Sequence, residues 1–271
     1  MSNRDFKTLL QDKWTAGKFL CVGLDPDIEK IPGSLKKGNV GETLLAFNRS
    51  IIDATQDIVC AFKPNSAFYE AHGAEGFQIL QQTISYIRGI APGVPVILDA
   101  KRADIGNTNA GYVASAFDYL GADAITVHPY LGREAVEPFL DRKDKGVFVL
   151  CRTSNPGAGE LQDLSINGVP LYRHVAQKVA SEWNNNGNCG LVVGATYPTE
   201  MREIREGARE LPFLIPGVGS QNGDLQKSIE CGKDSEGKGF VLSVSRAIIY
   251  ADDAQSKAQE FDRAIREALI K

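Results

Sequence analysis

The sequence is poor in the features that mark secreted, membrane-bound and nucleic-acid-binding proteins. Its five cysteines are odd in number and form no CxxC pair, which argues against a disulfide framework or a zinc site. No stretch approaches the roughly 18 continuous apolar residues of a membrane span, and the polar N-terminus lacks the apolar region of a signal peptide. The formal net charge of −4 gives no basic field for nucleic acid. We therefore expect a cytoplasmic protein that binds neither membrane nor nucleic acid.

Histidine is also scarce, with three in 271 residues. His128 follows an apolar run and is the one histidine placed for acid–base work, although such a residue is more often a hydrogen-bonded packing histidine. No set of His, Asp and Glu shows the spacing of a metal site. The sequence thus gives no support for a bound metal, and we expect no cofactor.

What the sequence does contain is a regular alternation of apolar runs and amphipathic helical patterns. The runs are rich in Val, Ile, Leu and Phe with little polar alternation, as in parallel strands buried on both faces. Eight strands, each followed by a helix, favour a closed (β/α)8 TIM barrel over an open sheet, and the chain length is typical of one. The predicted strands cover 19–23, 59–63, 94–99, 124–128, 146–151, 190–195, 213–217 and 240–245.

No linker or shift in composition divides the chain, so we expect a single domain over 1–271. A helix over about 5–16 precedes the first strand and is predicted to cover the bottom of the barrel. Two connections, 25–39 and 152–168, are long for a compact fold. Loops of this length are usually functional and often act as lids.

The active site of an α/β barrel lies where its strands end. Asp99-x-Lys101-x-x-Asp104 stands at the end of the third strand. Alternation along an extended segment points Asp99 and Lys101 to the same side, into the barrel mouth. Three charges at a buried mouth are costly unless they pair. The motif predicts a positioned proton donor kept charged by carboxylates; a structural salt bridge at a loop is the alternative.

Four further strand ends carry polar groups of interest. The glycine-rich segment 217–221 and Ser245-Arg246 follow strands seven and eight, where barrels bind phosphate with backbone N–H groups and a fixed cation. The glycine spacing does not fit a dinucleotide fingerprint. Lys63 ends strand two, and a lysine directly after a buried strand is more often functional than a surface residue. A Schiff-base lysine is the competing functional interpretation. Asp25 follows strand one, where it suits a sugar hydroxyl or merely caps a turn.

At this point the motifs match a known family. The chain resembles the orotidine 5′-phosphate decarboxylases, and more closely their longer bacterial branch, from 19 to 250. The most specific string is DAKRADIGNT at 99–108. It is accompanied, in order, by VGLD ending at Asp25, FKPN from 62 to 65, RTSNPG from 152 to 157, PGVGSQ from 216 to 221, and Ser245-Arg246.

The resemblance implies a cofactor-free conversion of orotidine 5′-monophosphate to UMP and CO₂, the last step of de novo UMP synthesis. Lys101 would deliver a proton to pyrimidine C6, and Asp99 would lie against the departing carboxylate. Asp104 would reach into the partner's site, which implies a homodimer. Substrate contacts would come from Asp25, Lys63 and Thr108 at the ribose, Ser154 at the pyrimidine, and Gln221, Ser245 and Arg246 around the phosphate.

Two other functions share parts of this pattern. Magnesium-dependent 3-keto-gulonate-phosphate decarboxylases and hexulose-phosphate synthases also carry Asp-x-Lys-x-x-Asp, but an acidic metal ligand ends their second strand where this chain has Lys63. A catalytically dead nucleotide-binding barrel would be expected to have lost Asp99, Lys101 or Asp104, and all three are present.

Overall fold

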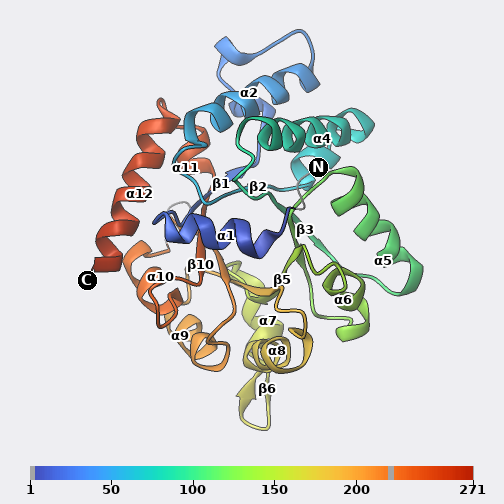
Figure 1. Cartoon of the computed structure of the whole chain (residues 1–271), viewed down its shortest axis with the longest axis vertical. Helices are drawn as coiled ribbons and strands as arrows, with labels where there is room; N and C mark the ends of the chain where they lie inside the picture. Colours follow the sequence, from blue (N-terminus) through green and yellow to red (C-terminus); the bar gives the residue numbers. More distant parts are fainter. Residues whose placement is uncertain (1–3, 219–222, 271) are drawn as a thin grey trace.

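A computed structural model describes residues 4–218 and 223–270 of the chain. Eight parallel strands form one sheet that curls into a nearly closed barrel (Figure 1), which confirms the predicted TIM-barrel fold. The sheet runs in the order β2-β1-β10-β9-β8-β5-β4-β3, and two isolated parallel bridges, Phe62 to Val96 and Asn65 to Asp99, join β2 to β3. The strands are β1 Leu20–Leu24, β2 Ala61–Pro64, β3 Ile97–Arg102, β4 Ala124–Val127, β5 Gly146–Arg152, β8 Cys189–Val193, β9 Phe213–Pro216 and β10 Phe240–Val244.

Helices surround the barrel as an outer ring (Figure 1). The main ones are α2 Val40–Thr55, α4 Gly73–Ile90, α5 Gly106–Val113, α6 Arg133–Leu140, α8 Leu171–Lys178, α9 Pro198–Gly207, α10 Leu225–Gly232 and α12 Ala254–Ile270. Two continue as π-helices, η3 Ala114–Tyr119 and η5 Val179–Trp183. Short turns are η1 Ile28–Lys30, η2 Gly33–Leu35, α3 Ala67–Glu70, η4 Pro156–Ala158, α7 Gly159–Gln162 and α11 Arg246–Ile249. None of the described helices is long and apolar enough to cross a membrane.

The strands β1, β2, β4, β8 and β10 are buried at every position. Both faces of such a strand pack against apolar groups, which explains why their sequences read as continuous Val, Ile, Leu and Phe runs. The side chains at the ends of these strands are therefore held by a rigid, close-packed frame.

Helix α1, Phe6–Thr15, crosses the bottom of the barrel as predicted (Figure 1). The Asp5 side chain caps it by accepting a hydrogen bond from the Thr8 amide at 2.8 Å. Phe6 and Trp14 are buried on its inner face, and the Trp14 Nε1 donates to the Phe240 carbonyl at 2.9 Å. Gly146 is the first residue of β5, and a Cβ there would lie 2.3 Å from the Phe6 ring. Strand β5 therefore begins with glycine because the ring fills that space.

The connection after β5 is folded rather than open. It forms η4, α7 and a small hairpin of β6 Ser165–Ile166 and β7 Val169–Pro170, which projects from the barrel (Figure 1). The buried Arg152 side chain holds its base: Nε lies 3.1 Å from Asp163 Oδ1, and the guanidinium stacks 3.8 Å from the centre of the Tyr197 ring. The long loop predicted over 152–168 is therefore an anchored arm.

Candidate active site

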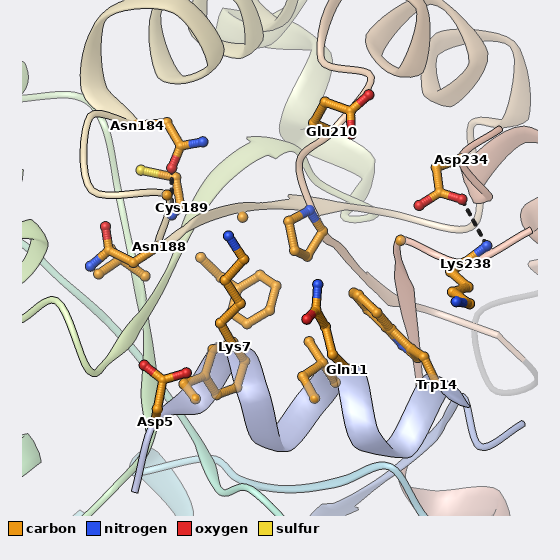
Figure 2. Close-up of a pocket in the computed structure, with 18 of the residues that line it drawn as sticks. Asp5, Lys7, Gln11, Trp14, Asn184, Asn188, Cys189, Glu210, Asp234 and Lys238 are labelled. Carbon is orange, nitrogen blue, oxygen red and sulfur yellow. Dashed lines mark hydrogen bonds between the residues drawn. The ribbon is translucent and has the colours of Figure 1, made fainter. Parts of the chain in front are cut away.

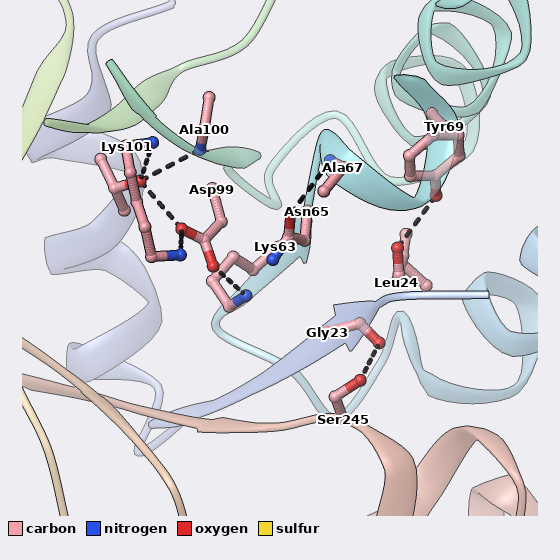
Figure 3. Close-up of polar contacts among 11 residues, drawn as sticks. Gly23, Leu24, Lys63, Asn65, Ala67, Tyr69, Asp99, Ala100, Lys101 and Ser245 are labelled. Atoms are coloured by element: carbon pink, nitrogen blue, oxygen red, sulfur yellow. Dashed lines mark hydrogen bonds and ion pairs between the residues drawn. The ribbon is translucent and has the colours of Figure 1, made fainter. Parts of the chain in front are cut away.

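The carboxylate of Asp99 lies between two lysines at the end of β3 (Figure 3). Asp99 Oδ2 is 3.0 Å from Lys63 Nζ, and Asp99 Oδ1 is 2.6 Å from Lys101 Nζ. The Lys63 and Asp99 side chains are 7% and 12% exposed, whereas that of Lys101 is 49% exposed. The cluster thus has one ammonium buried in the barrel and one that reaches the solvent at its mouth.

Burial and charge act in opposite directions on this cluster. Burial alone would lower the pKa of Lys63, but the neighbouring carboxylates of Asp99 and Asp25 outweigh it and raise that pKa above its usual value. Burial alone would raise the pKa of Asp99, but Lys63 and Lys101 hold it well below its usual range. The Asp99–Lys63 pair therefore stays charged across the physiological pH range.

Asp99 and Lys101 meet through an irregular backbone rather than through the simple alternation expected from the sequence. The register of β3 against β4 shifts between Leu98 and Arg102. Lys101 adopts φ 49°, in the left-handed region that non-glycine residues avoid, at a cost on the order of 1–3 kcal/mol. The expectation of a shared side was correct, but an undistorted extended segment was the wrong reason for it.

The end of β1 brings Asp25 to the same mouth. Its Oδ1 is buried and has no hydrogen-bond partner in the described part of the chain, and its charge acts on Lys63. A Cβ on Gly23 would lie 2.7 Å from the Ser245 Cβ, so the ends of β1 and β10 approach closely (Figure 3). A buried carboxylate oxygen without a partner is a group that a ligand hydroxyl would satisfy.

The predicted phosphate site is described only in part. Strands β9 and β10 pair side by side, and Gly217 leaves β9 with φ 100°. Ser245 Oγ donates to the Gly23 carbonyl at 3.4 Å, and Arg246, whose side chain is exposed, opens α11. The predicted Gln221 lies outside the described residues.

Asp104 and Thr108 stand apart from the three-residue cluster. The Asp104 amide donates to Asn109 Oδ1 at 2.8 Å, and Asp104 Oδ1 accepts from the Ile105 amide at 2.7 Å. Thr108 is exposed on α5. Within residues 4–218 and 223–270, no hydrogen bond or ion pair joins the Asp104 carboxylate to Lys101.

Ser154 and His128 occupy two other strand ends. A Cβ on Gly194 would lie 2.7 Å from the Ser154 amide nitrogen, so the chain after β5 lies against the end of β8. His128 Nε2 lies 3.1 Å from the Ala103 carbonyl, and its Nδ1 is buried with no partner among the described residues. The imidazole therefore supports the backbone just before Asp104.

Sequence reasoning missed two residues that hold this segment. The Thr126 hydroxyl on β4 contacts Asp99 Oδ1 at 2.9 Å. The Arg102 guanidinium pairs with Glu70, donates to the Ala100 carbonyl at 3.1 Å and lies over the Tyr112 ring. A polar residue inside the apolar strand 124–127 was the available signal for Thr126.

A second concave region lies at the opposite end of the barrel. This cleft of about 600 Å³ is bounded by α1 and by the turns that precede β5, β8 and β10. Lys7 and Gln11 project into it from α1 (Figure 2). It lies at the amino ends of the strands, remote from Asp99, so we assign the active site by its charges and not by cavity size. In the described part of the chain, no group of three or more His, Cys, Asp or Glu could hold a metal ion.

The barrel and its Lys-Asp-Lys cluster define a TIM-barrel enzyme with a charged site at the carboxyl edge of the sheet. The model of the orotidine 5′-phosphate decarboxylase / HUMPS family matches residues 18–261. The orotidine 5′-phosphate decarboxylase of Cellvibrio japonicus is 49% identical over 251 residues, 92% of this chain and 91% of that protein. The chain therefore belongs to the orotidine 5′-phosphate decarboxylase / HUMPS family.

Solved structures agree with this assignment. The Leishmania donovani OMP decarboxylase has a TM-score of 0.89 and 38% identity, covering 98% of this chain and 99% of that one. The Leishmania donovani UMP synthase has a TM-score of 0.90 and 40% identity, but the match covers only 56% of its longer chain.

Proposed function

We propose that the protein decarboxylates orotidine 5′-monophosphate to UMP and CO₂, the last step of de novo UMP synthesis. The observation that carries this proposal is the Lys63–Asp99–Lys101 cluster, with Lys101 Nζ at the solvent-facing end. Relatives that share up to 49% of the sequence over most of the chain bear the name of this enzyme.

The chemistry needs a fixed positive charge beside pyrimidine C6. Breaking the C6–carboxylate bond leaves the electron pair on C6, where no ring carbonyl delocalises it well. The Lys101 ammonium stabilises this developing carbanion and then donates a proton from Nζ to C6. Asp99, held ionised by two lysines, lies against the departing carboxylate. These groups are already charged and positioned, so no cofactor is required.

The substrate's remaining groups match the other strand ends. In this proposal Asp25 and Lys63 hold ribose hydroxyls, and the unpartnered Asp25 Oδ1 supports that role. Ser154 contacts the pyrimidine. Gln221, Ser245 and Arg246 bind the phosphate at the paired ends of β9 and β10. Binding energy from phosphate and ribose, remote from C6, is then available to lower the barrier at C6.

We also propose a homodimer with shared sites, in which Asp104 and Thr108 act in the partner's site. Two observations support it. The Asp104 carboxylate has no described contact with Lys101 of its own chain. Large apolar side chains are exposed on this part of the surface: Ile105, next to Asp104, at 61%, and Tyr130, two residues after the His128 that contacts the Ala103 carbonyl, at 81%, and such surface usually marks an interface.

The cell compartment, the domain organisation and the independence from metal belong to the same proposal. All five cysteines are buried free thiols, which suits the reducing cytoplasm. One sheet takes its strands from Leu20 to Val244, which supports a single domain over 1–271. The Lys63 ammonium bound to Asp99 occupies the position where related magnesium enzymes carry an acidic ligand, and its charge would repel a divalent cation.

The test is loss of orotidine 5′-monophosphate absorbance on adding protein in excess EDTA. We expect full activity with EDTA and with added magnesium. Activity that disappears in EDTA and returns with magnesium would contradict the metal-independent mechanism, and no turnover of this substrate under either condition would favour a sugar-phosphate enzyme of the same family. Binding of the nucleotide without turnover would indicate a non-catalytic barrel.

A further inference from the structure

We propose that Thr126 is a positioning residue that fixes both Asp99 and the backbone of Lys101. This inference rests on the proposed function, because it concerns how Lys101 is presented to pyrimidine C6. Thr126 lies on β4 and is 1% exposed, and the hydrogen bonds of its hydroxyl in the described part of the chain all go to residues 99–101. It therefore acts only through its neighbours.

The ladder between β3 and β4 leaves a gap at Thr126. Ile97 pairs with Ala124, Leu98 with Ile125, and Arg102 with Val127. Three residues of β3, 99–101, thus face the single residue Thr126. The ladder resumes beyond the gap, where the His128 amide donates to the Arg102 carbonyl at 3.0 Å. In a bulge of this size, backbone amides lose their usual acceptors on the neighbouring strand.

The Thr126 hydroxyl supplies the missing acceptor. It accepts from the Ala100 amide at 3.1 Å and from the Lys101 amide at 3.0 Å, and it donates to Asp99 Oδ1 at 2.9 Å. Figure 3 shows Asp99, Ala100 and Lys101 gathered at this point. A hydroxyl has one donor and two acceptor positions, and here all three are used.

This arrangement couples two features that the reaction needs together. The hydrogen bonds from the Ala100 and Lys101 amides to the Thr126 hydroxyl hold Lys101 in its left-handed conformation, which sets where the side chain leaves the strand. The third bond fixes the same Asp99 oxygen that lies 2.6 Å from Lys101 Nζ. Without the hydroxyl, the two backbone amides of the bulge would lose their hydrogen-bond acceptor, and Asp99 Oδ1 would lose the hydroxyl donor that orients it. Displacement of a reacting group by about 1 Å costs on the order of 10²-fold in rate.

The experiment compares Thr126→Val, which removes the hydroxyl at nearly constant shape, with Thr126→Ser, which keeps it. Thr55→Val is the matched control, because Thr55 is equally buried and its hydroxyl bonds only the Ile51 carbonyl within α2. For each variant, kcat and KM for orotidine 5′-monophosphate, affinity for UMP and hydrogen exchange of the 100–101 amides are measured.

We expect kcat to fall on the order of 10²-fold in Thr126→Val, with UMP affinity changed less than about threefold and faster exchange of the two amides. Thr126→Ser should retain most of the wild-type kcat, and Thr55→Val should retain all of it. A folded Thr126→Val with wild-type kcat would overturn the inference, as would an equal loss in Thr55→Val. Inactive wild-type protein would contradict the proposed function instead.

If Thr126→Val does not fold, hydrogen exchange of the wild-type protein still tests the inference. The Ala100 and Lys101 amides should then exchange as slowly as the strand amides of Leu98 and Ile125. Fast exchange of both amides in the folded wild-type protein would contradict a positioning role for the Thr126 hydroxyl.

Discussion

Two buried ion pairs at opposite ends of the barrel show how a structural charge differs from a functional one. At the amino end, Asp123 accepts from Arg4 Nε at 2.9 Å and Nη2 at 2.7 Å, and also from the Val96 amide at 2.9 Å. Arg4 further donates to the carbonyls of Pro92 and Val94. The Asp123 side chain is fully buried and that of Arg4 is 10% exposed, and their hydrogen-bonding capacity is met by the protein itself.

At the carboxyl end, one carboxylate serves two ammonium groups and the cluster remains open. Lys101 is half-exposed beside Asp99, and Asp25 Oδ1 has no described partner. Lys101 is also held in a strained backbone conformation. Unsatisfied groups and strain are stabilised here by the surrounding barrel, as is common where a ligand completes the site.

The difference between the two ends of the barrel is tested most strongly by removing one lysine from each end. Lys101→Ala should lower kcat by at least about 10⁴-fold, because it removes the proposed proton donor and its electrostatic stabilisation of the carbanion. Lys7→Ala, in the cleft at the amino end, should leave kcat unchanged. Steady-state kinetics with orotidine 5′-monophosphate checks both, and near-normal turnover by a folded Lys101→Ala would refute the assigned role.

Mixing two inactive variants tests whether the open cluster is completed by a partner. If Asp104 serves the neighbouring site, a heterodimer of Lys101→Ala and Asp104→Ala contains one site with both native residues. Random exchange makes half of the dimers mixed, so activity should recover to about a quarter of the wild-type value. Confirmed subunit exchange without recovery would show that each site uses its own Asp104.

Breaking the Arg4–Asp123 ion pair should lower the stability of the protein and leave its catalysis unchanged. Asp123→Ala leaves the largely buried Arg4 guanidinium without its carboxylate and should lower the free energy of unfolding by about 3–5 kcal/mol. The kcat of the folded fraction should remain at the wild-type value. Chemical denaturation measures the first quantity, and a large fall in kcat would show that the amino end is coupled to the active site.

Removing Asp99 should make stability depend on pH. In the native protein, the pKa of Lys63 is raised, so its contribution is complete below pH 10.5 and is lost only as pH rises further. The depressed pKa of Asp99 gives a contribution that is complete above about pH 3.8 and is lost as pH falls below it. Wild-type stability should therefore owe no slope to this pair between pH 7 and 10.

In Asp99→Ala, burial dominates and should lower the pKa of Lys63 below its unfolded value. The unfolded state then binds more protons, so stability should rise with pH from 7 to 10, by at most about 1.4 kcal/mol per pH unit. Adding Lys63→Met should abolish the slope. A flat profile in the single variant would mean that Asp25 alone keeps Lys63 charged.

Most of the barrel could be predicted because each strand is buried on both faces and its apolar run is local information. Helix α1 and the eight strands lie within a few residues of their predicted positions. The folded arm after β5 could not be predicted, because it depends on Arg152 meeting Asp163 and Tyr197, which are distant in sequence.

The site shows the same division. Asp99, Lys101 and Lys63 were identified from their places at strand ends and from a specific motif, and the structure brings them together. The left-handed turn at Lys101 was not predicted, because the hydroxyl that holds it belongs to Thr126 on another strand. Local alternation contains no information about that contact.

The central claim is that an ammonium group at position 101 performs the proton transfer, and it can be tested by rebuilding that group. The variant Lys101→Cys places a reactive thiol at a half-exposed position. The five native cysteines are buried, and burial raises the pKa of Cys21, Cys151 and Cys189 to about 12, so alkylation should be selective.

Treatment of the folded Lys101→Cys variant with 2-bromoethylamine installs a side chain that ends in an ammonium at nearly the length of lysine. Iodoacetamide installs an uncharged group and serves as the control. The account predicts that aminoethylation restores kcat by about 10²-fold or more over the unmodified variant, and that the control restores none. Complete modification by mass spectrometry without recovery, or equal recovery with iodoacetamide, would contradict it.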